Sequence, residues 1–107
     1  MENLTFDGRE GAPIDLALAA EWTANYRATI QLGEIKGHYF GKDILNDILA
    51  QEGCMGIRMY YALDKDGVKQ LILVGVDAYE NDQVGGIVAD YSMPCPSHCG
   101  NVNVLNT

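Results

Sequence analysis

Positive charge is scarce in this sequence. The chain of 107 residues carries 7 Lys and Arg against 15 Asp and Glu, so its formal net charge is −8. A surface of this sign repels phosphate backbones and anionic lipid headgroups. We therefore expect neither a nucleic-acid partner nor a membrane partner.

Long apolar runs are also missing. No stretch approaches the about 20 consecutive apolar residues that span a bilayer. The first residues, MENLTFDGREG, lack the basic and then apolar run of a secretion signal. We therefore expect a cytoplasmic protein. The length predicts one domain over residues 1–107, and a content of 48% hydrophobic and 21% charged residues is typical of a globular domain.

Cysteine and proline are few, with three of each. An odd number of cysteines excludes a complete disulfide framework, and thiols in a reducing compartment stay free, bind metal or do redox work. Pro94 and Pro96 interrupt regular structure, so we predict an irregular tail over residues 92–107. Residues 1–12 are polar and rich in glycine, which predicts a loose N-terminal arm.

Two segments carry helical periodicity. The first, 16–32, follows Asp15, a suitable N-cap, and precedes Gly33, a suitable C-terminal cap. Its apolar stripe consists of Leu18, Trp22, Tyr26 and Ile30, and we expect this stripe to pack in the core. The second segment, 42–51, places four apolar residues on one face: Ile44, Leu45, Ile48 and Leu49.

The clearest signal is a β-hairpin over residues 54–78. Two β-rich runs flank Asp64-Lys65-Asp66-Gly67, where Gly67 can adopt a positive φ. A register with Leu63 opposite Val68 predicts a core face, which consists of Met55, Ile57, Met59, Tyr61, Leu63, Val68, Ile72, Val74 and Val76. Residues 34–40 and 86–91 predict short additional strands. The fold class is therefore α+β: a small antiparallel sheet with two helices over one face and an irregular tail rich in Cys and Pro.

The opposite face of this hairpin predicts a partner-binding surface. In the same register it carries Arg58, Tyr60, Leu71 and Leu73, an apolar patch if nothing covers it. The C-terminal tail or a second copy of the chain could cover it. Arg58 could clamp an anion, but an arginine inside an apolar strand is more often paired with a carboxylate on a neighbouring element, which we expect here.

The cysteines and histidines form the other candidate site. Cys95 and Cys99 with His98 could bind zinc or copper(I), and Cys54 and His38 are the remaining soft ligands. However, three residues separate the paired thiols, and a second pair is lacking, which departs from structural zinc sites. A Cys95–Cys99 redox disulfide and inert structural thiols remain open, and the pattern favours the last.

The sequence contains one combination of residues that could support catalysis. Cys54 could act as a nucleophile with His38 and an acid such as Asp90, but a small buried cysteine at the start of a strand is far commoner. We assign no catalytic residue.

The segments GCMGIRMYYALD, from Gly53, and LILVGVDA, from Leu71, precede an ending similar to Cys-Pro-x-x-x-Cys but one residue shorter, Cys95-Pro96-Ser97-His98-Cys99. With these segments the chain resembles a group of small uncharacterised bacterial proteins, from about Trp22 to Cys99. The resemblance implies no activity and no functional residues.

Two hypotheses follow for the function. The first is a non-enzymatic domain that binds a protein partner or forms a homo-oligomer, based on the half-apolar second face of the hairpin. The second is a metal-binding protein, with zinc or copper, or a thiol-redox protein that uses Cys95 and Cys99.

Overall fold

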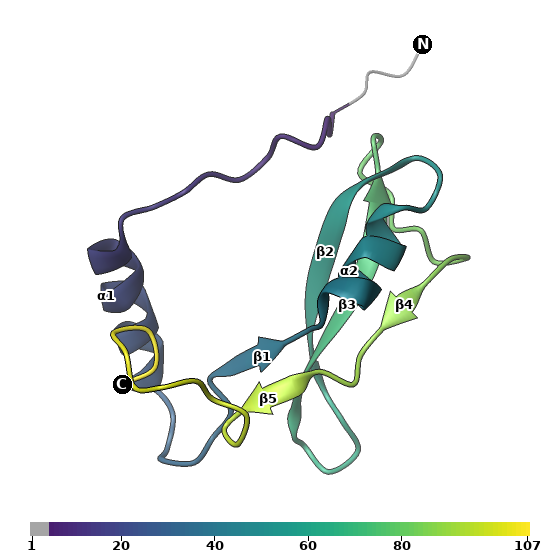
Figure 1. Cartoon of the computed structure of the whole chain (residues 1–107). Coiled ribbons are helices and arrows are strands. Elements are labelled where there is room, and N and C mark those ends of the chain that lie inside the picture. The colour runs from purple at the N-terminus through teal and green to yellow at the C-terminus, as the bar shows by residue number, and fades with distance from the viewer. Residues whose placement is uncertain (1–4) are drawn as a thin grey trace. The chain divides into compact units, whose positions relative to one another are not determined.

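A computed structural model describes residues 5–107 of the chain. These residues form two helices and two small antiparallel sheets, which confirms the predicted α+β class (Figure 1). The described residues divide into two compact units, 5–10 with 40–92 and 11–39 with 93–107. None of the helices in this described part is long and apolar enough to cross a membrane.

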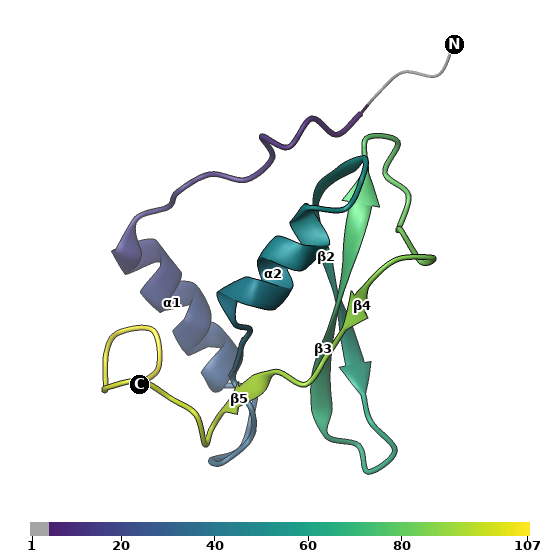
Figure 2. The ribbon, with the colours of Figure 1, turned by 45° about the vertical axis from the view of Figure 1, so that its right-hand side comes forward.

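The first unit is a helix packed on a three-stranded sheet. Helix α2 (Lys42–Leu49) precedes strands β2 (Cys54–Leu63) and β3 (Lys69–Asp77), which form the hairpin, and β4 (Val88–Ala89) follows. The strand order is β2-β3-β4, with every pair antiparallel. Figure 2 shows α2 lying across one face of the hairpin.

The core of this unit lies between α2 and the hairpin. Ile48 and Leu73 are completely buried, and Ala89 of β4 joins them. Partly buried side chains surround them: Phe40, Ile44, Leu45, Cys54, Ile57, Leu71 and Ile87. The predicted apolar face of the second helix is therefore confirmed at Ile44, Leu45 and Ile48, whereas Leu49 at the C-terminal end is exposed.

The hairpin turn is confirmed, but the predicted register is wrong by one residue. Gly67 has a φ of +78°, and the backbone N–H of Asp64 donates to the Val68 carbonyl. The loop therefore has three residues and ends in a left-handed glycine, a common hairpin connection. Leu63 consequently pairs with Lys69 instead of Val68.

This shift exchanges the two faces of β3 relative to β2, because side chains alternate along a strand. Leu71 and Leu73, predicted on the second face, pair with Tyr61 and Met59 and pack under α2. Val74 and Val76, predicted under the helices, lie on the opposite face.

The second unit contains helix α1 (Leu16–Arg27) and a two-stranded sheet of β1 (Gly37–Tyr39) and β5 (Met93–Cys95). Pro94 pairs with His38, so the predicted irregular tail contains one short strand. The predicted first helix, 16–32, is five residues too long at its C-terminal end. The expected core role of its stripe is wrong in this structure, because α1 has no buried residue and Trp22 is 56% exposed.

The predicted N-terminal arm is described only from Thr5, because residues 1–4 lie outside the described part. Residues 5–12 form no helix or strand. The backbone N–H groups of Thr5 and Phe6 both donate to the carbonyl of Ala78, at 2.9 and 3.0 Å. The arm is therefore attached to the first unit at the end of β3.

Candidate functional site on the hairpin

The second face of the hairpin carries contacts between β2 side chains and the loop that follows β3. A guanidinium nitrogen of Arg58 lies 2.5 Å from a carboxylate oxygen of Asp82, and the Tyr60 hydroxyl donates to the other oxygen. Asp82 bridges to Val76, on the side of β3 away from β2. The Arg58 and Tyr60 side chains therefore pass over β3, on the face where Val74 and Val76 are only 3% and 4% exposed.

These contacts hold Asp82 and Arg58 in their charged forms. The hydrogen bond from Tyr60, followed by the contacts with Arg58, lowers the pKa of Asp82 below 3.8, although partial desolvation opposes the shift. The hydrogen bond to Asp82 raises the pKa of Arg58 against a similar desolvation. The expected pairing of Arg58 with a carboxylate is confirmed.

The four predicted partner-binding residues do not form one surface. Arg58 and Tyr60 lie on the second face, while Leu73 is completely buried on the first face and Leu71 packs beside it. The prediction of a shared apolar patch is therefore wrong, and the one-residue register shift is the physical reason.

The exposed apolar surface lies instead on the first face, near the hairpin turn. Helix α2 has eight residues and is about 12 Å long, whereas the ten residues of β2 span about 33 Å. Ile57 packs against the core cluster that contains Ile48 of α2, whereas the side chains beyond it on the same face of β2 are exposed. Met59, Tyr61 and Leu63, which we call the β2 strip, are 54%, 94% and 69% exposed.

The prediction that the side chains of the β2 strip lie in the core is wrong, because all three are exposed. The signal that could have corrected this is length: a predicted helix of ten residues, about 15 Å long, is too short to cover a ten-residue strand. The contacts of Asp82 with Arg58 and Tyr60 were not predicted, because Asp82 lies in an acidic loop whose sequence indicates only a solvated surface.

A cavity of about 470 Å³ opens at the other end of β2. It is lined by Phe6, Gly8, Glu10, Leu49, Met55, Gly56, Ile57, Arg58 and Val76. Its walls are mainly apolar, and both charged groups already have partners: Arg58 binds Asp82, and Glu10 accepts hydrogen bonds from the Asp7 and Gly8 backbone. A Cβ added at Gly56 would meet nothing within 4 Å.

Cys54 lies in a polar cluster around Gly75. Its thiol donates to the Gly56 carbonyl at 3.2 Å. A Cβ at Gly75 would lie 2.6 Å from Gln83 Oε1, 2.9 Å from Gln51 Nε2 and 3.1 Å from the Cys54 sulfur. The two glutamine side chains and the Cys54 sulfur fill the space that this glycine leaves open.

The two glutamines also connect the elements around this cluster. Gln51 donates to the Ile48 carbonyl at the end of α2 and accepts from the Ile87 N–H just before β4. Gln83 donates to the Glu52 carbonyl. Within the described residues, Gln83 Oε1 and Asp90 Oδ1 are buried without a hydrogen-bond partner.

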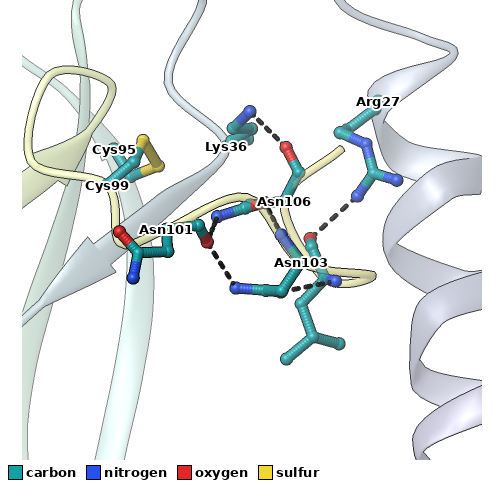
Figure 3. Close-up of a disulfide and its surroundings, with 8 residues drawn as sticks. Arg27, Lys36, Cys95, Cys99, Asn101, Asn103 and Asn106 are labelled. Carbon is teal, nitrogen blue, oxygen red and sulfur yellow. Dashed lines mark hydrogen bonds between the residues drawn. A yellow bond between two sulfur atoms is a disulfide. The ribbon is translucent and has the colours of Figure 1, made fainter.

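Cys95 and Cys99 form a disulfide in the second unit, with their Cα atoms 4.8 Å apart (Figure 3). The tail beyond it is held by hydrogen bonds to its carbonyls. Arg27 donates to those of Leu105 and Thr107, and Lys36 donates to that of Asn106 at 2.6 Å.

The structure brings together only two of the five predicted metal ligands, Cys95 and Cys99, and it bonds them to each other. His98 is exposed beside them, and Cys54 belongs to the first unit while His38 belongs to the second. Across residues 5–107, no group of three or more His, Cys, Asp and Glu side chains could hold a metal ion. Metal binding by the reduced cysteines stays a prediction.

No protein-family model matches this chain, and neither the curated proteins nor the solved structures contain a match. The resemblance to small bacterial proteins stays a prediction.

Proposed function

We propose that this chain is a protein-binding domain that associates with a second copy of itself. The observation that supports this most is the β2 strip, three large side chains exposed in one row on a regular strand. Tyrosine and methionine are enriched at the centres of protein interfaces. A strand also holds its side chains in place before binding, which lowers the entropy cost of association.

The size of the strip sets the expected strength. Full burial of a Met or Leu side chain contributes about 1.5–3 kcal/mol, so two copies of the strip supply on the order of 10 kcal/mol. Association itself costs about 4–15 kcal/mol. The two terms are similar, so we expect a reversible dimer whose population depends on protein concentration.

Sedimentation equilibrium over a range of concentrations tests this function. The expected result is a reversible equilibrium between the 11.7 kDa chain and a species of twice that mass. Tyr61→Ser should shift the equilibrium toward the monomer. Val84→Ser is the matched control, because Val84 is 77% exposed in the same unit but outside the strip. A strict monomer at millimolar concentration would contradict the proposal.

A second candidate function is thiol–disulfide exchange at Cys95 and Cys99. The supporting observation is their disulfide in a tail where Cys99 and His98 are exposed to solvent. When reduced, the same thiols with His98 would offer soft ligands, for which zinc or copper(I) is the expected metal.

Equilibration in redox buffers, followed by thiol labelling, tests this candidate. A pair that works in thiol exchange has a midpoint potential above about −300 mV. A midpoint well below that value would contradict the redox function. Elemental analysis of untagged protein tests the metal function, and the absence of zinc and copper would contradict it. Cys54→Ser should leave both measurements unchanged.

A further inference from the structure

Strand β2 is the edge of its sheet. The sheet order is β2-β3-β4, and within residues 5–107 the outer side of β2 pairs with no other strand. A strand in this position presents a row of N–H and C=O groups that can bind another extended chain.

The pairing with β3 identifies the groups that point outward. Asp64 and Val68 form a hydrogen-bonded pair, since the Asp64 N–H donates to the Val68 carbonyl. Hydrogen-bonded and non-hydrogen-bonded pairs alternate along an antiparallel ladder. The backbone groups of the even-numbered residues from Gly56 to Ala62 therefore face β3, and those of Ile57, Met59, Tyr61 and Leu63 face outward.

The N-terminal arm lies against the start of this edge, where a Cβ at Gly8 would be 3.4 Å from the Met55 carbonyl oxygen, but the segment from Ile57 to Leu63 lacks the features that usually prevent pairing. Natural edge strands are protected by lysine, proline, short length or bulges. β2 has ten residues, contains neither Lys nor Pro, and has its register irregularity between Cys54 and Gly56, beyond the outward-facing segment. Its one charge, Arg58, is bound to Asp82.

We propose that β2 pairs antiparallel with β2 of a second copy, about a two-fold axis at Tyr60. Reversal about Tyr60 is the arrangement in which all four outward-facing residues meet one another: Ile57 opposite Leu63 and Met59 opposite Tyr61, each twice. Each such pair exchanges two hydrogen bonds. The proposal specifies the surface for the self-association proposed above and rests on it.

The side chains in this register are complementary. Neighbouring strands of a sheet keep the same faces, so the α2 helices of both copies lie on the same side of the joined sheet. The two β2 strips then meet between them. Met59 of one copy lies beside Tyr61 of the other, a favourable sulfur–aromatic pair, and Ile57 lies beside Leu63.

Cross-linking tests the register directly. At the axis, Tyr60 lies opposite itself in a non-hydrogen-bonded pair with Cα atoms about 4.5 Å apart, within reach of a disulfide. In a Cys54→Ser background, Tyr60→Cys should give a disulfide-linked dimer under mild oxidation. Ala62→Cys, on the same strand and face, should not, because its two copies would lie about 13 Å apart along the strand.

A proline substitution tests the hydrogen bonds. Tyr61→Pro removes an outward N–H that the pairing with β3 does not use, and edge strands tolerate such a proline. The two-fold axis brings residue 61 of both copies into the interface, so each dimer loses two hydrogen bonds. The dimer dissociation constant should therefore rise roughly 30- to 100-fold. Tyr61→Ala keeps the N–H and should weaken the dimer less. Circular dichroism and urea unfolding verify that both variants fold.

The outcomes separate this inference from the proposed function. A wild-type dimer that cross-links at position 60 but not at 62 supports both. A wild-type dimer that survives Tyr61→Pro and fails to cross-link at position 60 overturns the β2 pairing while self-association stands. A wild-type chain that stays monomeric overturns both.

Discussion

At the scale of single residues, two glycines at neighbouring ladder positions, Gly75 and Gly56, serve different purposes. Gly75 leaves space for the side chains of Gln51 and Gln83, while Gly56 lines an open cavity. A methyl group therefore has opposite consequences at the two positions.

We predict that Gly75→Ala lowers the free energy of unfolding by about 1–3 kcal/mol. The new Cβ would displace glutamine side chains that hydrogen-bond the Ile48 and Glu52 carbonyls, and the cost is that of breaking these bonds. Urea denaturation measures the change. Gly56→Ala is the control and should be neutral or slightly stabilising; equal losses for both variants would contradict this explanation.

Asp82 gives the first unit a pH dependence with a definite sign. Its pKa is lowered in the folded state below 3.8, so its contribution to stability is present above the unfolded pKa and is lost as the pH falls through the folded pKa. Unfolding measured from neutral pH down to about pH 2 should show stability falling below about pH 4.

Two variants test whether Asp82 causes this loss of stability in acid. Asp82→Asn should reduce its steepness, and Tyr60→Phe should reduce it too, because the tyrosine hydrogen bond contributes most to the shift. Part of the loss should persist, since the pKa of Asp64 is lowered by the backbone N–H of Val68. Identical pH profiles for wild type and Asp82→Asn would contradict the assignment.

At the scale of secondary-structure elements, the side chain of Gln51, just after α2, holds the start of β4. Strand β4 has only two residues, and Gln51 accepts a hydrogen bond from Ile87 directly before it. The same side chain donates to the last turn of α2.

Gln51→Ala should therefore loosen β4 and destabilise the unit by about 1–3 kcal/mol, because it removes the hydrogen-bond acceptor of the partly buried Ile87 N–H. Hydrogen exchange at Ile87, Val88 and Ala89 should become faster than in the wild type. Gln70→Ala, which removes an exposed hydrogen bond to Asp64, is the control and should leave this exchange unchanged.

The helices and strands also show which parts of the fold could be predicted from the sequence. The hairpin and α2 were predictable because alternation, an Asp-x-Asp-Gly turn and helical periodicity agree locally. The register was not, because loops of three and four residues both suit this turn and differ by one pairing step. The free edge of β2 was not predictable either, since local patterns do not reveal that β4 joins β3.

At the scale of the whole molecule, net charge opposes the proposed dimer. Two chains of charge −8 repel each other, and salt screens this repulsion without weakening backbone hydrogen bonds or apolar contacts. The dimer should therefore be stronger at about 0.5 M than at about 0.02 M salt. Sedimentation equilibrium at both concentrations measures this, and weaker association at high salt would indicate an interface built on ion pairs.

The left-handed Gly67 has a further consequence for anyone who re-engineers this chain. If the existing chain closed the hairpin through a four-residue loop from Asp64 to Gly67, Leu71 and Leu73 would turn away from α2 and the valines of β3 would turn toward it. The amino acids of both strands would be unchanged, yet the two faces of β3 would be exchanged relative to α2. A redesign should therefore keep the three-residue loop that ends at Gly67, even where the surface residues around it are changed.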